Sequence, residues 1–394
     1  MRNFIFIPYT LIQLHLPILK NTAFFRSFNG QYNDNPKYIS EALHQKHPHI
    51  KIVWAIQDGK VESFPDYVKV VRLRSKEYAR YIARSQIVID NYTGCRSNLV
   101  TKNNPIKRII FKLLSKHRKG QFNLSTWHGT TLKHISLDEP KFKNAKFCKG
   151  YFNTDLLIAG CDLTANSFKT AFSWDKEILM CGTPRNDILF TNHKNELKKK
   201  LHLPVDKKVV MFAPTFRDNI EMSGLQQLKN IDIDKLLSIL KDKFNGDWCF
   251  VFRSHNLVMS AIQKGSLKLN SKIINGNEYE DMAEYLSCTD ILITDYSSSM
   301  FDYMLTRKPC FLYTPDLFNY KNSERGFYFD IEKTPFDIAQ TNDELISNIT
   351  NFDFECYRKK VEEFLVYIGN IETGKATDCI VEELEKHLEI SKKQ

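Results

Sequence analysis

Short apolar runs alternate with longer amphipathic stretches along most of the chain. A short continuous apolar run is typical of a strand buried on both faces, and apolar residues about three to four positions apart are typical of a helix. The predicted strands are 51–56, 85–91, 155–160, 207–214, 248–255, 290–295 and 309–313. The predicted helices are 35–47, 75–84, 162–172, 233–244, 279–288 and 297–306, with a last one near 375–392. This alternation predicts an α/β fold whose parallel sheets are covered on both faces.

The alternation restarts near residue 200, after a lysine-rich segment that contains Pro204. A chain of 394 residues is also too long for one ordinary hydrophobic core. We therefore predict two α/β domains, 1–195 and 196–375, and a C-terminal helix within 376–394.

The composition narrows the class of protein and the kind of partner. Apolar residues make up 42% of the chain and charged residues 26%, which is typical of a folded globular protein. A formal net charge of +10 indicates an anionic partner, namely a nucleic acid, a phosphorylated substrate or an anionic lipid surface. The lysines and arginines are dispersed and no RRM, KH or helix-turn-helix signature occurs, so we do not expect a nucleic-acid partner.

Cysteine usage and hydropathy bear on the cellular compartment. The nine cysteines are odd in number and never spaced as CxxC, which predicts neither a zinc site nor a disulfide framework and fits a reducing cytoplasm. No segment has the roughly 18 uninterrupted apolar residues that a membrane span needs. The apolar N-terminal stretch is interrupted by Pro8 and Pro17 and lacks a signal-peptide cleavage site. We therefore expect a cytoplasmic protein.

A basic amphipathic stretch occupies residues 105–120. It is either the solvated face of a helix or a patch that leans on anionic lipid, since lysines and arginines surround Ile109, Phe111 and Leu113. The second interpretation predicts peripheral attachment to the inner face of the plasma membrane.

Polar residues follow three predicted strands in the second half of the chain. They are Thr215, Arg217, Arg253, His255, Ser297 and Ser298. Ligands of open parallel sheets bind outside the carboxyl ends of the strands, where the loops gather. The sequence therefore predicts a binding site at one edge of the second sheet.

The residue types at this edge suit a phosphate. Ser297 and Ser298 stand where a helix begins, so their hydroxyls and the free N–H groups predict an anion site; alternatively, they only cap the helix. The fork of Arg253 suits a diphosphate, and His255 could donate to a phosphate or a leaving group, or be structural. Thr215 and Arg217, at another strand end, are also candidates for phosphate binding; alternatively, they form a plain turn at the end of the strand.

The stretch STWHGTTLK, residues 125–133, places His128 after a short apolar segment of the first domain. An imidazole titrates near neutrality and can take a proton from a hydroxyl nucleophile, and Lys133 would lie near a negative charge of the substrate. The alternative is a structural histidine in a turn. No HExxH, GxxxxGK[ST], GxGxxG or recognisable Ser–His–Asp spacing occurs, which argues against a zincin, a P-loop enzyme, a dehydrogenase and a triad hydrolase. A transferase with a nucleotide donor remains.

Seven segments together resemble the CDP-glycerol glycerophosphotransferase family, the enzymes of teichoic-acid priming and polymerisation. They are 27–39, 125–133, 182–189, 212–218, 252–255, 291–304 and 324–330, in the family's order. The resemblance implies a GT-B-like fold, with two Rossmann-like domains and an active-site cleft between them. It also implies transfer of a polyol phosphate from a CDP-linked donor to a hydroxyl, with release of CMP.

The resemblance implies a role for each matching residue. His128 would be the catalytic base, and His255 a second essential histidine that contacts the donor phosphates. The donor diphosphate would be bound by Ser297 and Ser298, with Thr215, Arg217 and Arg253 nearby and Arg325 as a further contact. The family holds the nucleotide at the segment 275–286, which points to Glu280 and Asp281, and Lys133 would lie on the acceptor side.

Departures from the family pattern leave the substrates open. Thr131 replaces a proline that often follows WHGT, and Asn256 follows His255 where a proline is frequent. The donor could therefore be CDP-glycerol or CDP-ribitol, and the acceptor a lipid-linked or polysaccharide hydroxyl of a teichoic-acid or capsule polymer. No cofactor and no dedicated metal site are expected, although Asp295 and Asp302 could approach a divalent cation. The rival functions are a GT-B glycosyltransferase that uses a nucleotide sugar, and a non-catalytic binding module.

Overall fold

The structure is a computed structural model, and it consists of two compact units. It describes residues 2–28, 30–57, 64–92, 113, 117–142, 153–215, 224–254, 271–318, 320 and 326–388. Unit 1 comprises Met1–His128, Asn144–Asp187 and Ile371–Gln394, and unit 2 comprises Gly129–Lys143 and Ile188–Asn370.

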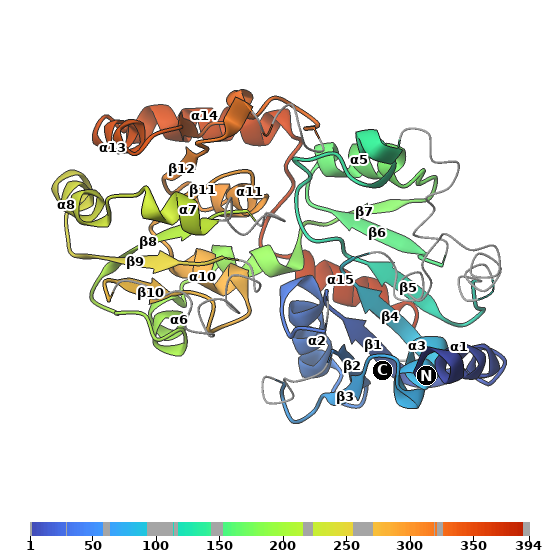
Figure 1. The fold of residues 1–394 in the computed structure, drawn as a ribbon. Coiled ribbons are helices and arrows are strands. Elements are labelled where there is room, and N and C mark those ends of the chain that lie inside the picture. The colour runs from blue at the N-terminus through green and yellow to red at the C-terminus, as the bar shows by residue number, and fades with distance from the viewer. Residues whose placement is uncertain are drawn as a thin grey trace. The chain divides into compact units, whose positions relative to one another are not determined.

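Unit 1 is built on a seven-stranded parallel sheet in the order β3-β2-β1-β4-β5-β6-β7 (Figure 1). The strands are β1 (Leu19–Arg26), β2 (Lys51–Ile56), β3 (Lys69–Arg72), β4 (Ser85–Asp90), β5 (Phe122–Ser125), β6 (Leu156–Ala159) and β7 (Ile178–Met180). The helices are α1 (Arg2–Gln13), α2 (Asp34–Lys46), α3 (Lys76–Arg84), α5 (Asp162–Ala171) and α15 (Ala376–Glu385). Every residue of β4 is buried, which explains why this strand is a continuous run without alternation.

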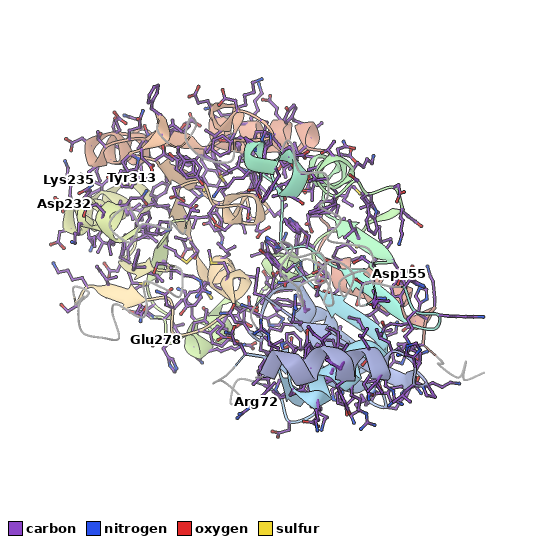
Figure 2. All side chains as sticks on the ribbon, turned by 45° about the vertical axis from the view of Figure 1, so that its right-hand side comes forward. Arg72, Asp155, Asp232, Lys235, Glu278 and Tyr313 are labelled. Atoms are coloured by element: carbon purple, nitrogen blue, oxygen red, sulfur yellow. The ribbon has the colours of Figure 1, made fainter. Side chains whose placement is uncertain are left out.

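Unit 2 carries a six-stranded parallel sheet in the order β10-β9-β8-β11-β12-β13. The strands are β8 (Lys208–Ala213), β9 (Trp248–Phe252), β10 (Ile273–Asn275), β11 (Ile291–Thr294), β12 (Cys310–Tyr313) and β13 (Asp337–Ala339). The helices are α6 (Lys194–Lys200), α7 (Gly224–Lys229), α8 (Ile233–Phe244), α10 (Met282–Cys288), α11 (Ser299–Met304), α13 (Asn342–Thr350) and α14 (Phe354–Tyr367). Helix α8 begins at Ile233 because the Asp232 carboxylate accepts a 3.1 Å hydrogen bond from the Lys235 backbone N–H; Figure 2 labels both residues.

The division of the chain differs from the predicted one at three places. Helix α15 belongs to unit 1, where it lies beside α2 (Figure 1), and its Ile380 and Leu384 are fully buried in the core with Leu43. Residues 129–143, expected in the first domain, belong to unit 2. They pair there with a distant segment, since the Tyr328 N–H donates to the Leu132 carbonyl at 2.9 Å. Unit 2 resumes at Ile188, so the expected boundary after residue 195 falls inside it.

The hydrophobic pattern located the predicted strands correctly, and the run 51–56 has the same bounds as β2. The structure adds β1, β3, β5, β7, β10 and β13, together with the helices α1, α7, α13 and α14. Strand β1 was not predicted because Lys20, Asn21 and Thr22 interrupt its apolar pattern. Its first three residues are not buried, whereas its last five are. Helix α10 begins later than the predicted 279, because Asp281 caps it.

Candidate active site

His128 lies on a tight turn after β5, in backbone that is unusual on both sides. Trp127 has φ +53° and Gly129 has φ +118°, and a bulky side chain rarely adopts the first of these conformations. Packing holds Trp127 there: its ring centroid lies 5.3 Å from that of Phe172, and its carbonyl accepts a 3.1 Å bond from the Asn35 side chain. The fold thus stabilises a strained turn at the predicted base.

The tautomer of His128 follows from one hydrogen bond. Its Nδ1 atom lies 2.8 Å from the backbone carbonyl oxygen of Asn91, which can only accept, so Nδ1 carries the proton and Nε2 keeps a lone pair. Burial lowers the pKa of His128, and the charge of Arg185 lowers it further, while the Asn91 bond and the Asp34 carboxylate act in the opposite direction. A neutral imidazole with a free Nε2 is the form that a general base requires.

Aromatic rings surround the imidazole. The centroid of the His128 ring lies 4.0 Å from that of Trp127, 5.5 Å from Phe28 and 5.9 Å from Tyr92. These rings limit the orientations open to the imidazole and contribute to the burial that lowers the pKa of His128.

A buried polar network holds the Asn91 carbonyl in place. The Asn91 side chain, which is fully buried, donates to Ser27 Oγ at 3.0 Å and to Asp34 Oδ2 at 2.6 Å, and accepts from the Phe28 N–H at 2.9 Å. The other Asp34 oxygen pairs with the Arg185 guanidinium at 2.8 Å. Four stretches of unit 1 that are distant in sequence therefore meet around His128.

The sequence interpretation included the segments 27–39 and 182–189 but assigned no role to Asp34, Asn91 or Arg185. A signal for Asn91 was available, because it is the last residue of the predicted buried strand 85–91, and functional side chains gather at the carboxyl ends of such strands. The pairing of Asp34 with Arg185 had no local signal, since the two residues are far apart in the sequence.

In unit 2 the predicted strand ends lie side by side. Strands β9, β8 and β11 are parallel neighbours, so the residues after them reach the same edge. The Asp295 carboxylate, which is fully buried, accepts bonds from both the backbone N–H of Thr215, at 2.7 Å, and the Thr215 hydroxyl. Asp295 therefore fixes the start of the loop that follows β8.

Arg253 stabilises the backbone at the carboxyl-end edge of the unit 2 sheet. Its guanidinium donates to the carbonyls of Gly276, Tyr279 and Glu280, the last two at 2.7 and 2.8 Å. It also lies over the Tyr285 ring, 4.8 Å from the centroid, and burial lowers its pKa. Arg253 thus holds the backbone of residues 276–280, the segment expected to carry the nucleotide, and its role as a diphosphate ligand stays a prediction.

Asp281 also has a structural explanation. It is almost fully buried and caps α10, accepting a 2.9 Å bond from the Ala283 N–H. Glu280 is half-buried, and its carbonyl is one of the Arg253 acceptors. For both residues a contact with the nucleotide stays a prediction.

The two serines before α11 differ in their contacts. The Ser297 hydroxyl lies 2.9 Å from that of Ser299. Ser298 occupies the N-cap position of α11, yet its side chain makes no capping hydrogen bond. Helix capping therefore does not account for the Ser298 hydroxyl, which supports the alternative that it meets a ligand.

Lys133 belongs to unit 2 and not to the expected acceptor-side domain. It forms an antiparallel bridge with Phe327, and its ammonium group lies 5.2 Å from the centroid of the Tyr320 ring. This pairing puts Lys133 beside the segment 324–330, of which the structure describes residues 326–330. Arg325, Arg217 and His255 lie outside the described residues, as does 105–120 apart from residues 113 and 117–120.

The described residues show neither a cluster that could hold a metal ion nor a membrane-spanning helix. No group of three or more histidine, cysteine, aspartate or glutamate side chains there is arranged to hold a metal ion. Within the same part of the chain, no helix combines the length and the apolar character needed to cross a bilayer.

Comparisons with known proteins match this architecture. The family model described as CDP-glycerol:poly(glycerophosphate) glycerophosphotransferase matches residues 9–386. A teichoic acid glycerol-phosphate transferase of Staphylococcus aureus is 30% identical over 390 residues, which cover 93% of each chain. A teichoic acid poly(glycerol phosphate) polymerase of Staphylococcus epidermidis is 31% identical over 390 residues, 93% of this chain. This chain spans about half the length of that polymerase, 51%, and 49% of the Bacillus subtilis polymerase.

The solved structure of the wall teichoic acid polymerase TagF superposes with a TM-score of 0.77 at 30% identity, covering 94% of this chain and 89% of that one. The predicted α/β, GT-B-like fold is thereby confirmed. By the match of the family model along nearly its whole length, the chain belongs to the CDP-glycerol:poly(glycerophosphate) glycerophosphotransferase family.

Proposed function

We propose that the protein transfers a polyol phosphate from a CDP-alditol to a hydroxyl of a lipid-linked or polysaccharide acceptor, with release of CMP. The observation that carries this proposal is the fixed tautomer of His128, whose Nε2 is left free to accept a proton. The family membership supports the donor class, and the names of the relatives support glycerol phosphate as the transferred group. Ribitol phosphate is the alternative transferred group.

In the proposed reaction the acceptor hydroxyl gives its proton to Nε2 of His128. The acceptor oxygen attacks the β-phosphorus of the CDP-alditol, the new P–O bond forms, and the bond from this phosphorus to the oxygen of CMP breaks. Negative charge develops on the transferring phosphate and on the departing CMP, so fixed donors and cations lower the barrier. We assign this role to Ser297 and Ser298 of unit 2, together with Arg217, His255 and Arg325, while Thr215 holds the start of its loop through Asp295.

We also propose that the acceptor is part of a teichoic acid, with a capsule polymer as the alternative. The relatives that match 93% of this chain are named for teichoic acid, which supports the first. A lipid-linked acceptor would bring the protein to the inner face of the plasma membrane, and the basic stretch 105–120 is the candidate contact with anionic lipid.

A donor panel tests the proposal. Purified protein is given a glycerol-phosphate primer with CDP-glycerol, CDP-ribitol or UDP-sugars, and the released nucleotide is measured. We expect CMP from CDP-glycerol, a loss of about 10²–10⁴-fold in His128→Ala, and no loss in His193→Ala, a matched control at an exposed surface histidine. Release of UDP or UMP from a sugar donor, with no CMP from either CDP-alditol, would overturn the proposal in favour of a glycosyltransferase.

A further inference from the structure

Unit 2 has a cavity at the edge of its sheet opposite to the predicted donor residues. Asp290 directly precedes β11, and Lys308 lies two residues before β12. Thr215 and Asp295, in contrast, follow the carboxyl ends of β8 and β11. Because all these strands are parallel, their amino ends share one edge and their carboxyl ends the other. The cavity is therefore separate from the proposed transferase site.

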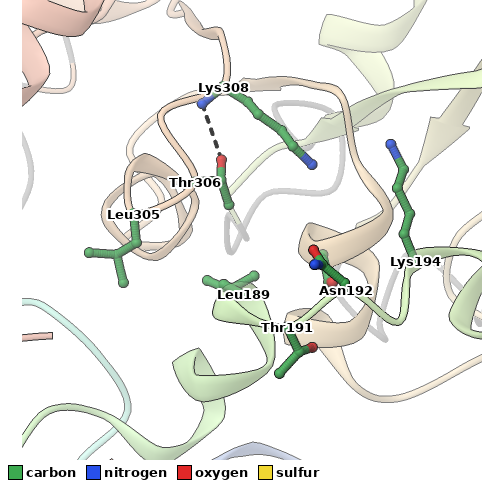
Figure 3. A pocket seen from close by; sticks show the side chains of 8 residues that line it. Leu189, Thr191, Asn192, Lys194, Leu305, Thr306 and Lys308 are labelled. Carbon is green, nitrogen blue, oxygen red and sulfur yellow. Dashed lines mark hydrogen bonds between the residues drawn. The ribbon is translucent and has the colours of Figure 1, made fainter. Parts of the chain in front are cut away.

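The cavity has a volume of about 390 Å³ and a mixed lining (Figure 3). That volume is in the range of small-molecule sites, roughly 300–1,000 Å³. Its lining residues are Leu189, Thr191, Asn192, Lys194, Ser287, Leu305, Thr306 and Lys308. Figure 3 shows Lys194 of α6 and Lys308 of the turn before β12 on its wall. Among the described residues of the lining most are polar, and the ionisable ones are both lysines.

Positive charge exceeds negative charge around this cavity. Lys194 pairs with the Asp290 carboxylate, whose second oxygen already accepts a 2.9 Å bond from the Val209 N–H. Lys308 donates only to an uncharged acceptor, the Thr289 carbonyl, at 2.8 Å, and Lys198 behind it donates to a carbonyl as well. Among the described residues, Asp290 thus pairs with Lys194, whereas Lys308 and Lys198 have no carboxylate partner. Burial and the neighbouring charge of Lys194 lower the pKa of Lys308 accordingly.

Two neutral donors in the lining have no hydrogen-bond partner in the described part of the chain. The Ser287 hydroxyl is one, although Ser287 is only 8% exposed, and the Asn192 amide at the rim is the other. Because Ser287 lines the cavity, its hydroxyl can donate a hydrogen bond to a ligand oxygen there. Hydroxyl, amide and ammonium donors around an excess of positive charge are the groups that bind phosphate oxygens.

We propose that this cavity is a second anion site, which binds the phosphate group of a phosphate ester or free phosphate. Lys308 and Lys194 supply the charge, and Ser287 and Asn192 supply neutral hydrogen bonds. The two leucines, Leu189 and Leu305, leave room for a small organic group on an ester. The proposal does not depend on the transferase function, because it concerns the other edge of the sheet.

The test is thermal unfolding of the full chain in sodium phosphate against sodium chloride at matched ionic strength. For the wild type we expect a Tm increase that saturates with phosphate, as mass action requires of a specific site. Asn192→Asp places a carboxylate at the exposed rim, so it should weaken phosphate binding by about tenfold or more, whereas Asn192→Ser should not. Lys308→Met should abolish the saturating response, and Lys235→Met, a control at an exposed lysine of the same unit, should keep it.

Phosphate also stabilises proteins without binding, by exclusion from their surface. An equal Tm increase in the wild type, Asn192→Asp and Lys308→Met would assign the effect to exclusion and overturn the proposal. Loss of the response in Thr215→Val, with its retention in Lys308→Met, would place the anion at the other edge and overturn it too. Calorimetric titration then distinguishes free phosphate from a phosphate ester as the ligand. Equal affinity for inorganic phosphate and glycerol 3-phosphate supports a site for the phosphate group itself. Binding of glycerol 3-phosphate alone supports a site for the ester.

Discussion

The Nδ1 atom of His128 lies 2.8 Å from the backbone carbonyl oxygen of Asn91. A backbone carbonyl differs from a carboxylate as a partner, because it fixes the tautomer without adding a negative charge that would favour the imidazolium form. Since the Asn91 side chain is itself held by Ser27 and Asp34, the orientation of the proposed base depends on the polar interior of unit 1.

The activity should have an acidic limb that reports on His128. Its pKa is lowered from the ordinary 6.5, so we expect kcat/KM to fall only below about pH 6.5 as the imidazole becomes protonated. The same shift affects stability: below pH 6.5 the unfolded chain binds this proton before the folded protein does, so acid destabilises the fold down to the folded pKa. A pH–rate profile checks the first point, and a limb centred above pH 6.5 would contradict it. His128→Gln should lose the limb.

Removing the Asp34 charge should destabilise unit 1. Asp34 and Arg185 are 5% and 12% exposed, and Asp34→Asn leaves the arginine buried without its carboxylate. Loss of one partner of a buried pair costs about 3–5 kcal/mol of the free energy of unfolding, measured by urea unfolding. In a double-mutant cycle with Arg185→Met, the two effects should sum to more than the double variant loses. Additive effects would mean that the pair contributes no coupling.

Asp34→Asn should also affect catalysis through Asn91. An amide at position 34 accepts a weaker hydrogen bond from the Asn91 side chain than the carboxylate does. We therefore expect kcat to fall while KM for the donor stays nearly constant, and we expect the acidic limb of the pH–rate profile to move. A merely structural role for Asp34 would lower the amount of folded enzyme without moving the limb, and this outcome would contradict a positioning role.

Thr215→Val should weaken the donor edge of unit 2. The substitution removes a hydroxyl that donates to the buried Asp295 carboxylate, while Thr215→Ser keeps it and serves as the control. Loss of one hydrogen bond to a charged group costs roughly 1.5–3 kcal/mol, which thermal unfolding measures. KM for the CDP donor should rise in Thr215→Val and change little in Thr215→Ser. Equal behaviour of the two variants would show that the backbone bond alone holds the loop.

The C-terminal helix should be essential for the stability of unit 1. Leu384 of α15 is fully buried, and Leu384→Ala should lower the free energy of unfolding by about 2–5 kcal/mol. Val366→Ala on α14 is the control, since Val366 is 82% exposed and its truncation should cost little. Similar Tm values for the two variants would refute the assignment of α15 to the core of unit 1.

The sequence by itself determined the α/β class, the bounds of strands such as 51–56, and the meeting of Thr215 with the neighbouring strand ends. Local burial produces the hydrophobic pattern from which the strands are predicted. Once the strands are known, the rule that parallel strands place their carboxyl ends at one edge brings the residues after them together. The stretch 125–133 pointed to His128 as a base, the family resemblance implied the same role, and that role stays a prediction.

Only the tertiary structure decided how those residues are held. It joined Asn91 to His128, paired Asp34 with Arg185, moved Lys133 to unit 2 through its bridge with Phe327, and returned α15 to unit 1. It also turned the Arg253 guanidinium toward three carbonyls. Each of these contacts joins segments distant in sequence, and hydrophobic periodicity reports whether a residue is buried but not which distant partner buries it.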